Sequence, residues 1–413
     1  MLIRNTSIYM ISSIIPALVS FIMIPIYTAQ MSPAEYGVYA MISILSSSFL
    51  FLIHMNLFNI LTRDYYDESI NKLSYIYNML SLFVVSFLLY FVLVTLFSGF
   101  LLRYLKMPML EGWIYLVLCL SFVQAIIHLY LTILRLQNKA MQFFYISVVL
   151  AFFSAFFGYY WVVVKQLKWQ GIFISQLISY SLVLCVIGLL CRRYLKPQSF
   201  NMARIKEFIL FSIRMFPTTV SWRLIDLSSR FFITRMIGLA QLGLYSLGFQ
   251  LTMPMTIIRD SFNRAWAPYF MKEMHNKCYR QILSYQSLFI AFITLVIVMV
   301  YFIAPFIVRL LFSEDYFFAI PFFNWFLLVV LFASLNSMVG NYLVFFKKEL
   351  NISKATSIGM IINVALNYVF ILDRGAIGSV QATVVAYMSI FAINLFYVYQ
   401  LYRAGAFESE IKG

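Results

Sequence analysis

The sequence predicts an all-α polytopic membrane protein, with about 12 transmembrane helices in two parallel-repeat six-helix lobes around a central cleft. Composition is the first reason, because 63% of the 413 residues are hydrophobic and only 11% are charged. Soluble domains carry roughly 25% charged residues. The second reason is that long apolar stretches recur along the whole chain, which is typical of membrane-spanning helices. A weak internal repeat between the two halves is the third.

The apolar stretches predict twelve spans in chain order. The first is too long for the apolar region of a signal peptide, so we expect it to stay attached. The connectors are short, so we expect no soluble domain between the helices. The predicted spans are residues 7–29, 36–61, 73–97, 112–136, 142–164, 170–194, 208–237, 241–264, 282–312, 317–346, 352–372 and 377–402.

The boundary between the first two spans has its own local signal. Residues 24–40 read IPIYTAQMSPAEYGVYA, and the segment from Ser32 to Glu35 has the spacing of a helix start. Ser32 can accept a hydrogen bond as the cap, Pro33 suits the first helical position, and Glu35 can reach back to the cap N–H. The sequence therefore predicts that a second helix begins near Pro33.

The second half of the chain repeats the first. Residues 35–40 (EYGVYA) align with residues 241–246 (QLGLYS) at an offset of 206, and the stretch from Gly171 aligns with the stretch from Gly378 at an offset of 207. An even number of helices per half makes both halves enter the membrane in the same direction, as in a parallel repeat. We expect an N-terminal lobe over 1–195, a basic cytoplasmic connector over 196–206 and a C-terminal lobe over 207–413.

The net charge of +15 follows the predicted topology. With the N-terminus in the cytoplasm, twenty basic residues fall in or beside cytoplasmic connectors and seven on the outer side. Cytoplasmic loops of membrane proteins carry such an excess of Lys and Arg. We therefore expect both termini in the cytoplasm, and we do not expect nucleic acid as a partner.

The seventh predicted span contains charges in its middle. Arg223, Asp226 and Arg230 recur at i, i+3 and i+7, so they share one helix face. Each would cost about 2.5–3.5 kcal/mol if it faced lipid at the bilayer centre, so they must face protein or a wet cavity. Two roles stay open: a network that only locks helices together, or the lining of an anion-handling cavity.

The second predicted span has a weaker polar stripe. Asn56, Asn59 and Arg63 recur at i, i+3 and i+7, with His54 close by. They are predicted to lie near the cytoplasmic end, where interfacial side chains are common. A place in the substrate-binding surface is the alternative, and we include them among the candidate substrate-binding residues.

Enzymes are disfavoured because their usual signatures are absent from the sequence. It contains no G-x-x-x-x-G-K-[ST] for a nucleotide and no H-E-x-x-H or G-x-S-x-G for hydrolysis. The four cysteines form no C-x-x-C pair, so neither a disulfide framework nor a metal site is expected. We expect a carrier with no catalytic residues, no cofactor and no metal.

Several short motifs resemble those of the O-antigen and polysaccharide flippases. These are N-T-S-I-Y from Asn5, I-P-I-Y-T from Ile24, S-P-A-E-Y-G from Ser32, R-D-Y-Y-D from Arg63, R-A-W-A-P-Y-F from Arg264, N-V-A-L-N from Asn363 and A-I-G-S-V-Q-A-T from Ala376. The resemblance runs through nearly the whole chain, and the stretch from Ile24 to Gly37 is its most specific part. One departure is Met55-Asn56-Leu57, where such proteins often have a Leu-Gly-Leu-like turn.

The resemblance places the chain in the multidrug/oligosaccharidyl-lipid/polysaccharide exporter superfamily. It implies a flippase that moves undecaprenyl-pyrophosphate-linked oligosaccharide across the bacterial inner membrane by alternating access. The lipid bilayer, a coupling H⁺ or Na⁺ ion and other polysaccharide assembly proteins are the remaining expected partners. Arginine suits bidentate contact with phosphate, so we expect Arg223 and Arg230 to engage the pyrophosphate or an acidic sugar, and Asp226 to hold them in place.

Two other functions stay open. A cation-coupled multidrug exporter has the same architecture, but a carrier of cationic drugs should have an acidic cavity, whereas the charges within the spans here are mostly basic. A membrane-embedded polysaccharide polymerase is a more distant alternative, since it would need acid and base groups in a sizeable extramembrane loop.

Overall fold

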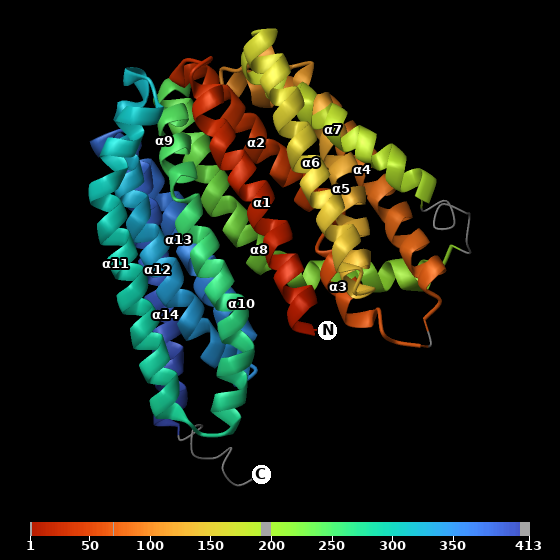
Figure 1. Cartoon of the computed structure of the whole chain (residues 1–413), viewed down its shortest axis with the longest axis vertical. Helices are drawn as coiled ribbons and strands as arrows, with labels where there is room; N and C mark the ends of the chain where they lie inside the picture. Colours follow the sequence, from red (N-terminus) through yellow and green to blue (C-terminus); the bar gives the residue numbers. More distant parts are fainter. Residues whose placement is uncertain (1, 69, 191–199, 405–413) are drawn as a thin grey trace. The chain divides into compact units, whose positions relative to one another are not determined.

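The structure, a computed structural model, describes residues 2–68, 70–190 and 200–404, and within these ranges the chain forms helices and no strand. It divides into two compact units, Met1–Phe216 and Pro217–Gly413, which we call unit 1 and unit 2. In Figure 1 the helices are coloured along the sequence, from red at the N-terminus to blue at the C-terminus. The predicted connector at 196–206 lies partly outside the described residues, so the lobe boundaries proposed from the sequence stay a prediction.

Unit 1 contains the first eight helices, the last of them only in part. Within it, α1 packs along α6, α6 along α7, and α2 along α5. The elements are α1 (Leu2–Thr28), α2 (Pro33–His54), α3 (Leu57–Asp64), α4 (Lys72–Tyr104), η1 (Pro108–Leu110), α5 (Trp113–Leu136), α6 (Ala140–Tyr159), η2 (Tyr160–Val164), α7 (Lys168–Leu190) and α8 (Met202–Met236).

Unit 2 begins inside α8, at Pro217. In this unit α13 packs along α14, α12 along α14, and α9 along α12. Its further elements are α9 (Leu239–Leu251), α10 (Met253–His275), α11 (Tyr279–Leu311), η4 (Glu314–Ala319), α12 (Ile320–Phe345), α13 (Glu349–Arg374) and α14 (Ala376–Arg403).

The predicted start of the second helix is confirmed. The Ser32 hydroxyl accepts a hydrogen bond from the Glu35 N–H at 3.4 Å, and the Glu35 carboxylate accepts one from the Ser32 N–H at 2.9 Å. Pro33 occupies the first turn. This reciprocal pair satisfies N–H groups that have no partner inside the helix.

Ten helices of the described residues are long and apolar enough to cross a membrane. They account for all the predicted spans except the seventh and the eighth. The seventh lies in α8, whose charges at Arg223, Asp226 and Arg230 lower its apolar character. The eighth is not one helix: α9 and α10 meet at Thr252, and Pro254 lacks the N–H that a continuous helix would need there.

The second predicted span is also divided, because α2 ends at His54 and α3 begins at Leu57. Between them Met55 and Asn56 both have left-handed backbone conformations, with φ of 46° and 61°. The sequence pattern predicts one continuous second helix that carries Asn56, Asn59 and Arg63 on one face. This prediction is wrong, because these three residues belong to α3 and its N-cap and not to α2. In each unit the second span is therefore interrupted, after His54 in unit 1 and after Leu251 in unit 2.

The same helix pairs recur in both units, as the sequence repeat predicts. The fifth span packs on the sixth (α6 on α7, α13 on α14), and the fourth packs on the sixth (α5 on α7, α12 on α14). Gly171 and Gly378 occupy matching places near the start of the sixth span. A Cβ on either glycine would collide with backbone atoms at the end of the preceding span, of Trp161 and Phe370 respectively.

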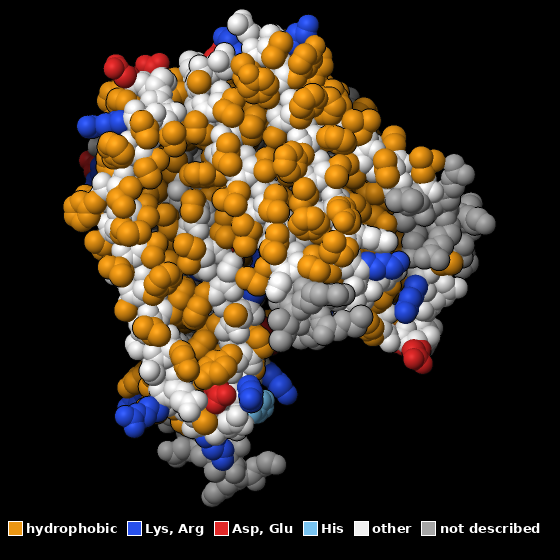
Figure 2. Space-filling view, viewed as in Figure 1, with side chains coloured by type: hydrophobic (Ala, Val, Ile, Leu, Met, Phe, Trp, Pro, Cys, Tyr) orange, Lys and Arg blue, Asp and Glu red, His pale blue; other side chains and the backbone are white. Residues whose placement is uncertain are grey.

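Exposed apolar side chains line one face of α11. Leu288, Leu295 and Phe302 recur every seven residues and are 66%, 67% and 73% exposed. Figure 2 shows hydrophobic side chains covering α11, with Lys and Arg near its ends. A broad apolar surface of this kind is stable in a bilayer and not in water.

Candidate functional site

The strongest candidate site lies on the part of α8 that belongs to unit 2. Arg223, Asp226 and Arg230 are all half-buried there. The Arg230 guanidinium lies over the ring of Phe249 on α9, 5.6 Å from the ring centroid, and its buried Nε has no hydrogen-bond partner among the described residues. Asp226 is within electrostatic range of both arginines. A half-buried guanidinium with an unused N–H can bind an anion.

The adjacent face of α8 is held by a buried polar network. The Ser228 hydroxyl donates to Asn363 Oδ1 at 3.0 Å, and Asn367 Nδ2 donates to the Ser229 hydroxyl at 3.2 Å. Both asparagines belong to α13 and are fully buried. These bonds fix the rotation of α8 about its axis, and so they determine where its charged face points.

The network continues into α14 and α9. The Ser379 hydroxyl donates to Asn367 Oδ1 at 2.6 Å, and Asn363 Nδ2 donates to the Thr383 hydroxyl at 3.3 Å. The side chain of Tyr245 on α9 reaches Ser229 and Thr383. Polar groups at membrane depth are costly unless they are paired, and this arrangement pairs them across four helices.

The sequence analysis includes Asn363 and Asn367 only as part of a family motif and predicts no role for them. A signal was available, because two asparagines at i and i+4 in an otherwise apolar span are as unusual as the charges of α8. Their partners on α8 and α14 could not be read from the sequence.

The predicted polar stripe of the second span lies in unit 1. Arg63, at the end of α3, forms ion pairs with Asp64 and with Glu207 of α8, where Nη2 and Oε1 are 3.3 Å apart. Its guanidinium also lies 5.5 Å from the ring centroid of Phe211. Asn59 is exposed on α3. Arg63 therefore links α3 to the start of α8, and a substrate role for it remains a proposal.

Asp64 is the most buried carboxylate of this ion-pair cluster, with 12% of its side chain exposed. The Tyr75 hydroxyl donates to it at 3.0 Å. Burial works against the charged form of Asp64, but the hydrogen bonds from Arg63 and Tyr75 outweigh burial and hold the pKa of its carboxyl below the usual range.

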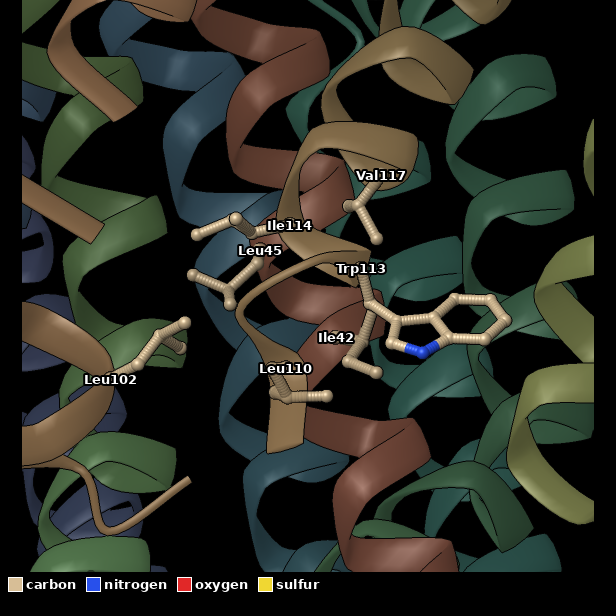
Figure 3. A pocket seen from close by; sticks show the side chains of 7 residues that line it. All are labelled: Ile42, Leu45, Leu102, Leu110, Trp113, Ile114 and Val117. Atoms are coloured by element: carbon tan, nitrogen blue, oxygen red, sulfur yellow. The ribbon is translucent and has the colours of Figure 1, made fainter. Parts of the chain in front are cut away.

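A pocket between α2, α4 and α5 is a poor candidate for polar chemistry. Figure 3 shows that Leu102 of α4 and Leu45 of α2 face a wall formed by the start of α5. All the lining side chains are apolar or aromatic: Ile42, Leu45, Leu102, Leu110, Trp113, Ile114 and Val117. Within the described residues no three His, Cys, Asp or Glu side chains gather as a metal site would require.

Comparison with known proteins agrees with the family resemblance of the sequence. A family model described as polysaccharide biosynthesis protein matches residues 2–274. No curated protein matches the chain.

Three solved structures that share the fold are a flippase and two transporters. The lipid II flippase MurJ, in an inward closed conformation, has a TM-score of 0.71 at 15% identity, over 96% of this chain and 87% of that chain. A mutant of the Vibrio cholerae MATE transporter VcmN has a TM-score of 0.66 at 13% identity, over 97% and 96% of the two chains. An inward-facing MATE family transporter of the MOP superfamily has a TM-score of 0.67 at 12% identity, over 94% and 95%. At these identities the likeness shows a shared fold.

Proposed function

The chain belongs to the polysaccharide biosynthesis protein family, and from this we propose that it is a flippase for undecaprenyl-pyrophosphate-linked oligosaccharide. The cargo would be an O-antigen or related polysaccharide repeat unit, moved across the bacterial inner membrane by alternating access. The family and the transporter fold support a multi-pass membrane carrier. The choice of cargo rests on the chemistry of α8.

The observation on which the proposal rests is that one donor of Arg230 lacks a hydrogen bond. Its buried Nε has no partner among the described residues, although a buried donor without a hydrogen bond is costly. A pyrophosphate oxygen would satisfy that donor, and the planar guanidinium suits bidentate contact with phosphate. Arg223 lies seven residues before it on the same helix and would contribute a second cation.

Asp226 has a different role in this proposal. It lies between the two arginines, beside the network of Ser228, Asn363 and Thr383. A carboxylate there can hold the arginines when the cargo is absent and can bind a coupling H⁺ or Na⁺ during the transport cycle. Coupling to either ion is part of the proposal.

A cation-coupled multidrug exporter is the second candidate, favoured by the fold shared with MATE transporters. The charges on α8 argue against it. Arg223 and Arg230 outnumber Asp226, so the net charge of the stripe would repel a cationic drug and attract an anionic cargo.

The proposal is tested by restoring surface polysaccharide in cells that lack their own O-antigen flippase. We expect Arg230→Ala to abolish export while the amount of folded protein in the membrane stays at the wild-type level. Arg230→Lys should support only part of the wild-type export, because an ammonium group cannot make the bidentate contact. Arg309→Ala, which removes an exposed arginine at the end of α11, is the matched control and should leave export unchanged.

Two results would contradict the proposal at different levels. Failure of the wild-type chain to restore polysaccharide, although it is folded in the membrane, would exclude this cargo. A loss of folded protein in Arg230→Ala, with unchanged export per folded molecule, would show that the α8 stripe only locks helices together.

A further inference from the structure

The junction between α2 and α3 is built from two residues that rarely adopt its backbone conformation. Met55 (φ 46°, ψ 39°) and Asn56 (φ 61°, ψ 15°) are consecutive and both left-handed, and neither is glycine. L-residues seldom take this conformation one after the other, so surrounding contacts must hold the junction.

Several hydrogen bonds meet at this junction. The Met55 N–H donates to the Phe51 carbonyl at 2.8 Å, and the Met55 carbonyl accepts from the Ser212 hydroxyl of α8 at 2.7 Å. The Ser86 hydroxyl of α4 points to the Met55 sulfur at 3.7 Å. The Asn56 N–H donates to Nδ1 of His54 at 3.2 Å.

The last of these bonds requires a neutral histidine. A backbone N–H can only donate, so His54 Nδ1 must be the acceptor and the ring proton must be on Nε2. When imidazole is protonated both ring nitrogens are donors, and Nδ1 can no longer accept. Protonation of His54 therefore removes one of the bonds that hold Asn56 in its left-handed conformation.

Aromatic rings surround the His54 side chain. Its ring is tilted by 30° against that of Phe58, with 4.5 Å between ring centroids, and Phe51 meets it edge-on at 5.9 Å. His128 of α5 lies 6.5 Å from Phe58, so two of the three histidines in the chain flank one phenylalanine. The charged residues and histidines on the parts of these elements near the junction are His128 and Arg135 on α5, Arg63 and Asp64 on α3, Lys72 on α4, and Arg204, Lys206, Glu207 and Arg214 on α8.

Four of those charges are already paired with one another. Asp64 and Glu207 form ion pairs with Arg63, and Glu207 also pairs with Arg204. Lys72 lies 4.8 Å from the ring centroid of Tyr65. Near neutral pH a change of charge at the junction therefore requires histidine, the side chain whose unperturbed pKa of about 6.5 lies closest to that range.

We propose that His54 is a proton-binding site in unit 1, and that proton binding there opens the hydrogen bond that closes the α2–α3 junction. The junction contacts the unit 1 part of α8 through Ser212, so a change in its backbone alters the support of that part of the helix. The proposal concerns a proton site and does not depend on the identity of the cargo.

Hydrogen exchange of the purified full chain in lipid nanodiscs tests this. Exchange of the peptide covering residues 52–60 is measured at about pH 7.5 and pH 5.5, with times corrected for the intrinsic pH dependence of exchange. We expect several-fold faster exchange at the lower pH in the wild-type protein. A peptide over 249–256, which covers the α9–α10 junction and contains no histidine, is the internal control and should not change.

Two variants distinguish the contributions of His54 and His128 to this pH response. Glutamine can accept the Asn56 N–H but does not titrate, so His54→Gln should abolish the pH response of peptide 52–60. His128→Gln should keep it. The proposal would be overturned if peptide 52–60 of the wild-type protein had the same corrected exchange rate at both pH values. It would also be overturned if His128→Gln lost the pH response while His54→Gln kept it.

Discussion

Arg230 and Asp64 are charged residues with opposite surroundings. The Asp64 carboxylate accepts hydrogen bonds from Arg63 Nη2 and the Tyr75 hydroxyl, each at 3.0 Å. Arg230 lies over an aromatic ring, and one of its buried donors is unused within the described residues. A charge removed from water is stable when its partners are present, so Asp64 has a structural environment, and we propose that a ligand completes the environment of Arg230.

Acid should weaken the cluster around Asp64. Its pKa is held below the usual range, so its contribution to stability is complete above about pH 4 and is lost as the pH falls through the folded-state value. We expect Asp64→Asn to lower the free energy of unfolding at neutral pH by about 1.5–3 kcal/mol, the range for hydrogen bonds to charged groups. Thermal unfolding in detergent between pH 3 and pH 7 measures both effects.

Asp373 provides the control for that comparison. It pairs with Arg374 on the surface, where 69% of the Asp373 side chain is exposed. Exposed ion pairs contribute little, so Asp373→Asn should leave the melting temperature nearly unchanged. Equal losses of stability in the two variants would show that the buried position of Asp64 is unimportant.

At the scale of the elements, the second helix of each unit is interrupted by a different device. Pro254 removes a backbone donor where α9 meets α10, and this is visible in the sequence. Met55 and Asn56 interrupt the helix by taking left-handed conformations, each at a cost of roughly 1–2 kcal/mol. Hydrogen bonds from α4 and α8 offset that cost, so the interruption depends on residues far away in the chain.

Close packing between the last two helices of unit 2 makes Gly378 sensitive to substitution. A Cβ there would collide with the backbone carbonyl of Phe370 on α13, which cannot move aside cheaply. We expect Gly378→Ala to destabilise the protein by about 1–3 kcal/mol, as overpacking usually does. The midpoint of thermal unfolding and the folded fraction in size-exclusion chromatography would record this.

Gly188 of α7 is the matched control, because a Cβ there would meet no atom within 4 Å. Gly188→Ala should be neutral or stabilising by up to about 1 kcal/mol, since alanine favours a helix over glycine. If both alanine variants behaved alike, the contact between α13 and α14 would not be as tight as the structure indicates.

At the scale of the whole molecule, two units with the same helix pairing follow one another along the chain. The even number of spans predicted for each half would return the chain to the starting side of the membrane, and the excess of basic residues predicts that this side is the cytoplasm. The ten apolar helices support a multi-pass protein, and the side on which each terminus lies is a prediction.

Reporter fusions test this topology. We expect a phosphatase that is active only in the periplasm to be inactive when fused after Lys412, because the C-terminus is predicted to be cytoplasmic. The same reporter placed after Lys106, in the connector between α4 and α5, should be active. The reverse pattern would overturn the orientation and would place the basic connectors outside.

The sequence by itself determined the membrane class, most of the helices, the start of α2 and the repeat of the two halves. Each of these depends on local properties. Hydrophobicity adds up along a span, and the capping pair of Ser32 and Glu35 involves residues three positions apart. The anomaly of charges in α8 was equally visible, since it needs only the cost of a charge in hydrocarbon.

The tertiary structure alone decided which polar groups meet. Asn367 pairs with Ser229 across 138 positions of the chain, and the left-handed Met55 is held by Ser212 across 157. No periodicity encodes these pairs, because they depend on how helices from distant parts of the sequence pack. The α2–α3 junction and the buried network beside Arg230 therefore became visible only in the folded chain, where packing selects among backbone conformations that the local sequence leaves open.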